Sequence, residues 1–517
     1  MMGYKSFLKT SLLIMLIIFV GKLIAFGKDI VISAFFGAGS NTDAFFIALN
    51  ITSILFIAFY STVSLVFLPL YNETKIKYGL KATNLFSSNI INLYLFISFI
   101  ITLLSIYFAP ELVNLINTSS NSTNIDLTII LLRIMVLSFM FSIFTSFMTA
   151  IQLSNNQYLS PHLVPIVNNF IVVIAIIILA PKYGIYIPTI AGVLAWIIQV
   201  PLHKWIVRKN FNYIFHLNFK DPSIKKMGLL FIPAFLGIFI DQTNIMIDTI
   251  LASGLEEGSV SALNYANRLI SFASGIFIMA IMSIMYPMFS KYIINEEEEK
   301  LNTSIRTSIR LLLLVMLPIT AIIFVFHHEI VSIVFHRGEF DESATQITSS
   351  VFFFYSIGII FLGLRELFNK VFYAQKNTKT PLFISFIAVS TNIILSVILV
   401  KKMGVTGLAL ASSISLILYV LLQLMILKYK IGKDFYNGIF IFLTKTTIAI
   451  SISLYVMWSY KTYNYLDNLY LDFLIGSFLG IICFLLPLLL LKNEELCNLK
   501  ILILKKLKIY KQKKKDI

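Results

Sequence analysis

Charged residues are scarce in this sequence. Only 13% of its 517 residues are Asp, Glu, Lys or Arg, whereas 58% are hydrophobic. An ordinary soluble domain is about one quarter charged, because it must cover its surface with groups that water solvates. The composition therefore excludes a soluble globular protein. It also leaves no basic soluble domain that could use the net charge of +16 to bind nucleic acid.

Cysteine and the common catalytic motifs are also lacking. The two cysteines, Cys483 and Cys497, provide neither a disulfide framework nor the spacing of metal ligands. The sequence contains no Walker motif, HExxH, CxxC or glycine-rich turn between a strand and a helix. His327 and His328 are adjacent, but they point to different faces of a helix. We therefore expect neither an enzyme nor a resident cofactor or metal.

Long apolar runs take the place of charge. They are roughly 18 to 28 residues long, and about 20 residues are needed to cross a bilayer as a helix. The runs lack the alternation of a membrane β-barrel, which predicts an all-α polytopic membrane protein. The first run continues through Lys22 without a cleavage pattern, and we interpret it as a retained span. We expect fourteen spans, near residues 12–36, 45–70, 90–108, 127–153, 164–180, 187–205, 229–252, 263–288, 311–326, 351–374, 382–400, 408–427, 439–460 and 469–491.

Lys and Arg gather on alternate connections between these spans. Cytoplasmic loops of membrane proteins carry an excess of both residues. The two ends of the chain share a side with the basic residues near 75–81, 204–226, 291–310, 376–379 and 428–433. We therefore expect both termini in the cytoplasm. The basic tail, residues 493–517, is either a solvated topogenic charge run or a short interfacial helix attracted to anionic lipid.

The first twelve spans form two similar groups, offset by about 220 residues. The matching landmarks include Asp29 and Asp248, Pro69 and Pro287, and Asn169 and Asn392. Each group has an even number of spans, so the copies insert in the same orientation. We predict an N-terminal lobe at 1–210, a C-terminal lobe at 211–430 and two further spans at 431–492. Such a duplication favours a transporter that rocks one lobe against the other.

A few ionisable residues fall inside the apolar runs, where each costs at least a few kcal/mol unless it faces protein or water. Lys22 and Asp29 are seven residues apart and share a helix face. Spans one and eight are close in the duplicated plan, so we expect Lys22, Lys28 and Arg268 to converge on one anionic ligand such as a diphosphate. The alternative is that Lys28 and Asp29 neutralise each other or that the cations snorkel to the interface.

Three segments carry a family resemblance. They are Lys28–Phe46, which contains Asp43, Asp248–Leu269, which contains Arg268, and Phe372–Pro381. Through them the sequence resembles the MurJ/MviN family of lipid II flippases, within the multidrug/oligosaccharidyl-lipid/polysaccharide exporter superfamily, over nearly the whole chain. The resemblance implies a two-lobed fold, a cationic cavity for a diphosphate-sugar head group, and a groove for the polyprenyl tail formed with the last two spans. Lys28, Asp43 and Arg268 match functional positions of the family.

The sequence departs from the family at Lys28, at Asn267, where the family usually has an acidic residue, and in span two. The family usually has arginine where Lys28 stands. Lysine keeps the positive charge but cannot form the bidentate hydrogen bonds of arginine with phosphate. The family also has basic residues in span two, where this chain reads Ile51–Phe59. The expected activity is translocation of an undecaprenyl-diphosphate-linked saccharide like lipid II. Another lipid-linked repeat unit, of capsule, O-antigen or teichuronic type, is the alternative.

Two other classes of protein remain as rivals. A multidrug cation antiporter would favour acidic and aromatic cavity walls, whereas these spans carry surplus cations. A membrane-embedded glycosyltransferase would need carboxylates and a large outer loop, and the outer loops here are short. The expected substrate-binding residues are therefore those of the cationic cavity: Lys22, Lys28, Asp29, Asp43 and Arg268.

The energy for transport is expected from the membrane potential or from a Na+ or H+ gradient. Moving one charge through 100 mV supplies about 2.3 kcal/mol. Asp241 and Asn392 are the candidate ion-coupling residues, with an ordinary hydrogen-bonded helix contact as the alternative for each. The expected partners are the lipid-linked saccharide and membrane lipids, and the expected location is the bacterial inner membrane.

Overall fold

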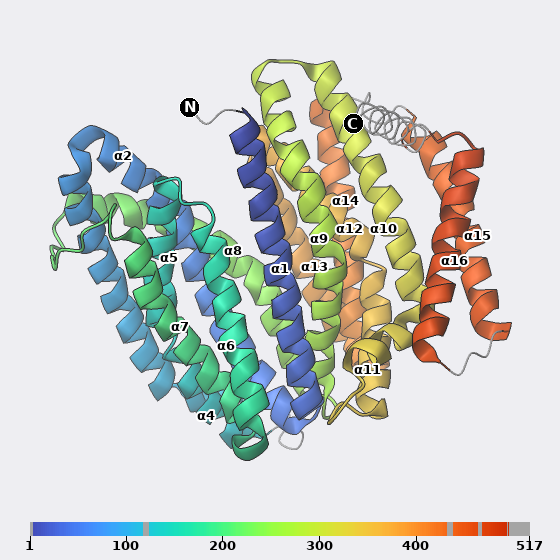
Figure 1. Ribbon diagram of the computed structural model, residues 1–517, viewed down its shortest axis with the longest axis horizontal. Coiled ribbons are helices and arrows are strands. Elements are labelled where there is room, and N and C mark those ends of the chain that lie inside the picture. The colour runs from blue at the N-terminus through green and yellow to red at the C-terminus, as the bar shows by residue number, and fades with distance from the viewer. Residues whose placement is uncertain (1–3, 117–123, 432–437, 464–467, 494, 496–517) are drawn as a thin grey trace, which may run out of the picture. The chain divides into compact units, whose positions relative to one another are not determined.

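Every regular element that the structure describes is an α-helix (Figure 1). The computed structural model describes residues 4–116, 124–431, 438–463, 468–493 and 495, without the side chains of residues 4–12, 55, 241, 430 and 431. The side chain of Asp241 and the tail beyond residue 495, with Cys497, therefore lie outside the described residues. The helices are α1 (Tyr4–Phe36), α2 (Ser40–Tyr107), α3 (Ala109–Ile116), α4 (Ile125–Val136), α5 (Phe139–Ser154), α6 (Ser160–Tyr183), α7 (Tyr186–Val207), α8 (Pro222–Ser253), α9 (Ser259–Ile294), α10 (Glu298–Phe335), α11 (Glu342–Ser356), α12 (Ile359–Ala374), α13 (Lys379–Met403), α14 (Val405–Ile431), α15 (Ile439–Tyr463) and α16 (Leu469–Leu490).

Fourteen membrane spans can be assigned to these helices. In the described part of the chain, eleven helices are long and apolar enough to cross a membrane, or twelve if the bent pair α11–α12 counts as one span. Helix α2 counts once among them, although its 68 residues extend for about 100 Å, roughly three times the hydrocarbon thickness. Gly79, with a φ of 74°, divides α2 into two spans, and the 33-residue α1 supplies the last one. The all-α polytopic fold class is confirmed.

The connection between the second and third predicted spans is helical rather than a loop. Within this stretch of α2, Glu73 accepts a hydrogen bond from Lys77 at 2.8 Å and another from Lys226 of α8 at 2.7 Å. An ion pair between residues i and i+4 supports an exposed helix by a few tenths of a kcal/mol. The fall in hydropathy therefore predicts the end of the membrane span. It does not predict the end of the helix, which continues past the span.

Two of the predicted spans consist of two helices each. The span at 127–153 comprises α4 and α5, and the span at 351–374 lies in α11 and α12, which meet at an angle of 45°. Hydroxyl groups satisfy carbonyls near both breaks, because Ser138 Oγ donates to Met135 O and Ser413 Oγ donates to Phe354 O, each at 2.7 Å. Hydropathy does not reveal such breaks, since the helices on both sides are apolar.

Irregular backbone recurs along the chain at the predicted offset of about 220 residues. The break after α4 at Val136 corresponds to the break after α11 at Ser356. Residues with positive φ recur at nearly the same offset, and the pairs are Asn156 and Lys376, Gly184 and Gly404, and Gly37 and Gly258. Lysine rarely adopts this conformation, so its occurrence opposite Asn156 reflects a shared backbone rather than a shared side-chain preference. These coincidences support the predicted internal duplication.

The helices form two compact units, each described here by itself. The first contains residues 1–268, 335–347 and 393–408, and the second contains residues 269–334, 348–392 and 409–517. In the first unit, Phe67, Phe147 and Phe231 belong to one buried cluster of α2, α5 and α8. In the second, Phe289, Phe368 and Phe442 belong to another, built on α9, α12 and α15. The lobe boundaries at 210 and 430 stay predictions.

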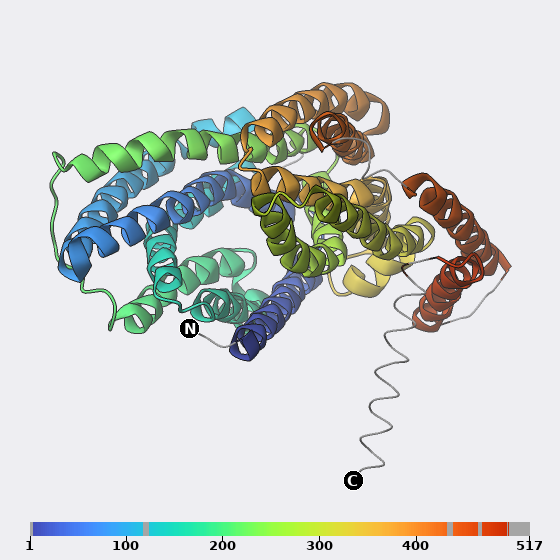
Figure 2. The same cartoon turned by 90° about the horizontal axis from the view of Figure 1, so that it is seen from above.

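Helices α15 and α16 lie side by side in the second unit (Figures 1 and 2). Two charge pairs attach this hairpin to α10. Arg310 of α10 pairs with Glu495 at 3.2 Å, and Glu329 of α10 pairs with Lys461 of α15 at 2.7 Å. Arg310 and Glu329 are separated by about 28 Å along the helix, which approaches the thickness of the hydrocarbon core. Helix α10 therefore holds the hairpin near both of its ends.

We expect Gly476→Ala in α16 to lower the thermal stability of the protein. A Cβ at Gly476 would overlap the ring of Phe326, which is fully buried in α10. Extra volume in a packed site typically costs about 1–3 kcal/mol. Gly192→Ala in α7 is the matched control, because a Cβ there meets nothing within 4 Å. The measurement is the midpoint of thermal unfolding of the purified protein in detergent. Equal midpoints for the two variants would contradict the close approach of α16 to α10.

Candidate transport site

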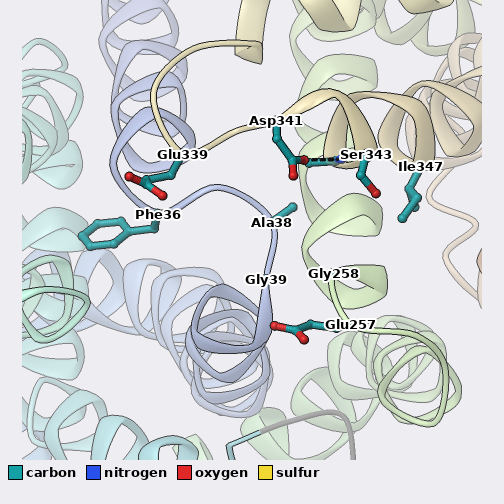
Figure 3. A pocket seen from close by; sticks show the side chains of 10 residues that line it. Phe36, Ala38, Gly39, Glu257, Gly258, Glu339, Asp341, Ser343 and Ile347 are labelled. Carbon is teal, nitrogen blue, oxygen red and sulfur yellow. Dashed lines mark hydrogen bonds between the residues drawn. The ribbon is translucent and has the colours of Figure 1, made fainter.

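Three connections of the first unit meet at one end of its helices (Figure 3). We call this meeting point the loop junction, and we define it as residues 36–40, 254–258 and 336–341. The first connection joins α1 to α2, the second joins α8 to α9, and the third joins α10 to α11. Backbone hydrogen bonding ties the third to the first, because Glu339 N donates to Ala34 O at 3.0 Å.

Two carboxylates cap helix N-termini across the loop junction. Asp43, in the first turn of α2, is 2% exposed and accepts hydrogen bonds from Gly258 N at 2.8 Å and Ser261 N at 2.7 Å. The Ser261 hydroxyl donates a third bond to Asp43 at 2.5 Å. In the opposite direction, Glu257 accepts a bond from Ser40 N, at the start of α2, at 2.5 Å. Each helix N-terminus thus receives a negatively charged side chain. The carboxylate accepts hydrogen bonds from N–H groups that have no partner within the helix, and its charge interacts favourably with the helix dipole.

Backbone meets backbone at the loop junction, with no room for side chains between the connections. Gly37, Gly258 and Gly338 all have positive φ, and a Cβ on any of them would collide with a carbonyl oxygen of another connection or of α1. Tyr265 of α9 supports the contact, because its hydroxyl donates to Gly37 O at 3.1 Å. Its ring packs on Phe46, with centroids 5.2 Å apart. The result is a close contact between the three connections.

A cavity of about 350 Å³ lies at the loop junction, and carboxylates mark its wall (Figure 3). Its acidic residues are Glu257, Glu339 and Asp341. Two of these three already serve backbone groups, because Glu257 accepts from Ser40 N and Asp341 accepts from Ala344 N at 2.8 Å. We therefore read the acidic wall as part of the capping structure. The sequence analysis named none of these three residues.

Two of the three predicted cations, Lys28 and Arg268, lie close to Asp29, about two to three helical turns from the loop junction. Asp29 of α1 is 6% exposed, and its Oδ2 lies 3.8 Å from Nε of Arg268 on α9. Lys28 is half-buried and lies within electrostatic range of both Asp29 and Arg268. Among the described residues, neither Lys28 nor Lys22 has a carboxylate within 4 Å, so Asp29 is paired with Arg268 rather than with its neighbour Lys28. The local group carries two more positive charges than negative ones when Lys22 is included.

Helix geometry relates this cationic group to the loop junction. Arg268 follows Ser261 by seven residues, and Asp29 precedes Gly37 by eight, so each lies about 10–12 Å from the junction along its own helix. Lys22 lies seven residues further along α1, on the same face as Asp29, and its side chain is half-buried. The structure thus places Lys28, Asp29 and Arg268 together, with Lys22 about two turns away.

The ion-coupling candidates stay predictions. Asn392 is fully buried, and its Nδ2 donates to Ser412 Oγ at 3.1 Å, as an ordinary helix contact also would. Asp241 lies outside the described side chains. Asp248, by contrast, is 9% exposed and accepts a hydrogen bond from Ser396 Oγ at 3.2 Å. The sequence analysis named Asp248 as a landmark of the repeat and as the start of a family segment but not as an ion-coupling candidate, although a carboxylate in an apolar run is itself the signal for such a position.

Solved structures with the same fold include transporters of two kinds. A structure described as "Lipid II flippase MurJ, inward closed conformation" matches with a TM-score of 0.80 and 26% identity, covering 94% of this chain and all of that one. An inward-facing multidrug resistance MATE family transporter of the MOP superfamily matches with a TM-score of 0.70 and 13% identity, covering 80% of this chain and 94% of that one. The second likeness concerns the fold alone.

Sequence relatives agree with the first of these structures. A protein of Thermotoga maritima named "Probable lipid II flippase MurJ" is 26% identical over 500 residues, which cover 95% of this chain and 98% of the relative. A protein of Buchnera aphidicola with the same name is 27% identical over 431 residues, covering 79% of this chain and 81% of the relative. The family model described as "Lipid II flippase MurJ" matches residues 32–478. This match covers most of the chain and includes the loop junction, and the chain belongs to the MurJ family.

Proposed function

We propose that this protein is a flippase that carries lipid II, an undecaprenyl-diphosphate-linked saccharide, from the inner to the outer leaflet of the bacterial cytoplasmic membrane. The observation that carries the proposal is the group of Lys28 and Arg268 around the single carboxylate of Asp29, with Lys22 on the same face of α1 about two turns away. Cations in a membrane span are costly unless they meet an anion or water. A diphosphate between lipid and sugar supplies that anion, and the names of the curated relatives support lipid II as its source.

The direction of transport follows from the proposed topology. Lys and Arg are concentrated on the side of the two termini, and this supports a topology with both termini in the cytoplasm. Helix α1 then runs outward, so the loop junction lies on the outer side and the cationic group lies deeper. With the junction closed, substrate reaches the cations from the cytoplasmic side. Release to the outer leaflet requires the junction to open.

Opening the loop junction breaks the hydrogen bonds that cap its two helix N-termini. Gly258 and Ser261 must leave Asp43, and Ser40 must leave Glu257. Each such bond contributes a net stabilisation of roughly 0.5–3 kcal/mol, with bonds to charged groups at the upper end. The closed state is therefore stable yet reversible. A bound diphosphate close to Arg268 acts on α9, the same helix whose N-terminus Asp43 holds.

The polyprenyl chain needs an apolar surface outside the cationic group. We assign it to the hairpin of α15 and α16, within the predicted segment 431–492, because exposed apolar side chains such as Trp458, Leu474 and Phe478 cover it. The stretch Ile51–Phe59 of α2 is uncharged and supplies no additional cation for the head group. A related lipid-linked repeat unit therefore stays the second candidate substrate.

We further propose that a Na+ or H+ gradient, or the membrane potential, drives the cycle. Asp241 and Asn392 remain candidates, and the buried Asp248 with its partner Ser396 is a third position where a cation or proton can be exchanged. Transport of a fluorescent lipid II analogue into the lumen of proteoliposomes is expected to accelerate several-fold under one imposed gradient. Asp248→Asn should remove that response, whereas Asp221→Asn, at a helix N-cap outside the spans, should keep it. Equal rates under every gradient would refute the coupling.

The cationic group can be tested by complementation of a strain depleted of its lipid II flippase. Lys28→Ala and Arg268→Ala should abolish rescue at matched expression, because each removes one charge-assisted contact worth roughly 1.5–3 kcal/mol. Lys28→Arg should retain rescue, since it keeps the charge and adds a bidentate grip. Lys182→Ala, at an exposed lysine near the end of α6, is the control. If the well-expressed unmodified protein fails to rescue, the substrate is another lipid-linked glycan or the protein is a drug exporter.

The role of the loop junction can be tested with Asp43→Asn. The asparagine amide keeps one acceptor oxygen, so at least one of the three donors that now point at the carboxylate loses its partner, and an unsatisfied buried donor costs roughly 1–3 kcal/mol. The junction should therefore open more often. A cysteine at Ala44, which is fully buried, should react several-fold faster with an impermeant maleimide added outside cells, in a background with Cys483 and Cys497 changed to serine. Asp341→Asn, which keeps a competent helix cap, is the control. Unchanged labelling in Asp43→Asn would refute this role of the junction.

A further inference from the structure

The connection between α7 and α8 is held against α2 without regular secondary structure. We call residues 211–221 of this connection the strap. Three side chains of α2 bind its backbone: Ser88 Oγ accepts from Ile214 N at 3.0 Å, and Asn92 Nδ2 donates to His216 O at 2.8 Å. Asn89 makes a pair of bonds with Asn218, accepting from its N at 2.7 Å and donating to its O at 3.1 Å. The strap therefore has a fixed position on the first unit.

This fixed position leaves apolar side chains uncovered. Only Phe211 at the start of the strap is buried in the core of the unit. Five of the following residues present large apolar side chains at the surface: Tyr213, Ile214, Phe215, Leu217 and Phe219. Phe215 is 81% exposed and Phe219 is 60% exposed. Because hydrogen bonds hold the backbone in place, these side chains cannot pack into the core of the unit. An apolar environment outside the unit must therefore cover them.

Cations flank this apolar surface at both ends. Six basic residues surround it, all exposed: Lys204, Arg208, Lys209, Lys220, Lys225 and Lys226. Lys226 is paired with Glu73, and the other five have no carboxylate within 4 Å among the residues that the structure describes. Asp221 is the only acidic residue of the strap, and it is already engaged in capping α8 through Ser223 N. The surface around the strap is therefore both apolar and strongly positive.

The helices on either side locate this surface at the boundary of the lipid. Helices α7 and α8 are both membrane spans, and the strap joins their ends. Trp205, in the last turn of α7, is 60% exposed, and the guanidinium of Arg208 lies 5.1 Å from the centre of its ring. Aromatic rings together with Lys and Arg are typical of the membrane–water interface. Apolar side chains beside a basic cluster bind anionic bilayers in two ways, through burial of apolar surface and through attraction between the cations and anionic head groups.

We propose that the strap is a lipid-binding element that inserts the side chains between Tyr213 and Phe219 into the interface of the bilayer and binds anionic head groups through the flanking cations. This role does not depend on the transported substrate. Its consequence is an attachment of α2 to the membrane surface, because Ser88, Asn89 and Asn92 connect that helix to the strap.

The proposal can be tested by fluorescence of the full chain in nanodiscs. Cysteines are placed singly at Phe215 or at Glu299, an exposed acidic position at the start of α10, in a background with Cys483 and Cys497 changed to serine, and labelled with an environment-sensitive dye. Both labels replace exposed side chains, so folding is not at stake. The nanodiscs contain either neutral lipid alone or a mixture with phosphatidylglycerol. Quenching is measured with iodide from water and with nitroxide-labelled lipid.

In anionic nanodiscs, iodide should quench the label at 215 about fivefold less than the label at 299, and nitroxide lipid should quench it strongly. Changing Lys209 and Lys220 to glutamine should return the iodide quenching toward the control value, with a smaller effect in neutral nanodiscs. Equal iodide quenching at 215 and 299 in both lipids would overturn the proposal. Protection from iodide without quenching by nitroxide lipid would also overturn it, because protein and not lipid would then cover the strap.

Discussion

The hydrogen bonds that Gly258 and Ser261 donate to Asp43 are the constraint on which the first unit depends. They fix the N-terminus of α9 against the first turn of α2, and with it the register of every residue that follows along α9. Seven residues later this register places Arg268 beside Asp29. The bond from Ser40 to Glu257 fixes the same contact from the other direction. One buried carboxylate therefore determines both how the junction closes and where the cations lie below it.

The carboxylates of the loop junction and the cations of the spans have different roles in this structure. Carboxylates at the loop junction serve backbone N–H groups, so the acidic wall of the cavity is explained by capping alone. In the cationic group, Lys22, Lys28 and Arg268 outnumber the one carboxylate of Asp29, and neither lysine has a carboxylate within 4 Å among the described residues. Groups of one sign that a fold does not need for its own stability indicate a ligand of the other sign. The cationic group therefore supports the proposed diphosphate ligand more directly than the junction does.

The fold class could be predicted from the sequence more completely than the site. Apolar runs gave the spans, and the family segments named Lys28, Asp43 and Arg268, because hydropathy and intramembrane charge are properties of single positions. The breaks at Val136 and Ser356 were not predictable, since apolar residues flank them on both sides. Nor was the partner of Asp43: Gly258 and Ser261 lie more than 200 residues away, and only the fold brings them to it. Asp248 was visible as a charge in an apolar run, but its partner Ser396 carries no signal of its own.

The length of α2 has a mechanical consequence. Its part from Ser40 to the irregular residue Gly79 measures about 58 Å, so it extends well beyond the hydrocarbon layer. Asp43 holds one end of this rod, and the strap is attached to α2 beyond the other. A rod of that length is a lever: a tilt of about 10° at the loop junction displaces its far end by about 10 Å. Movement at one membrane surface is thus enlarged at the other, and a single helix links the two faces of the bilayer without a separate relay.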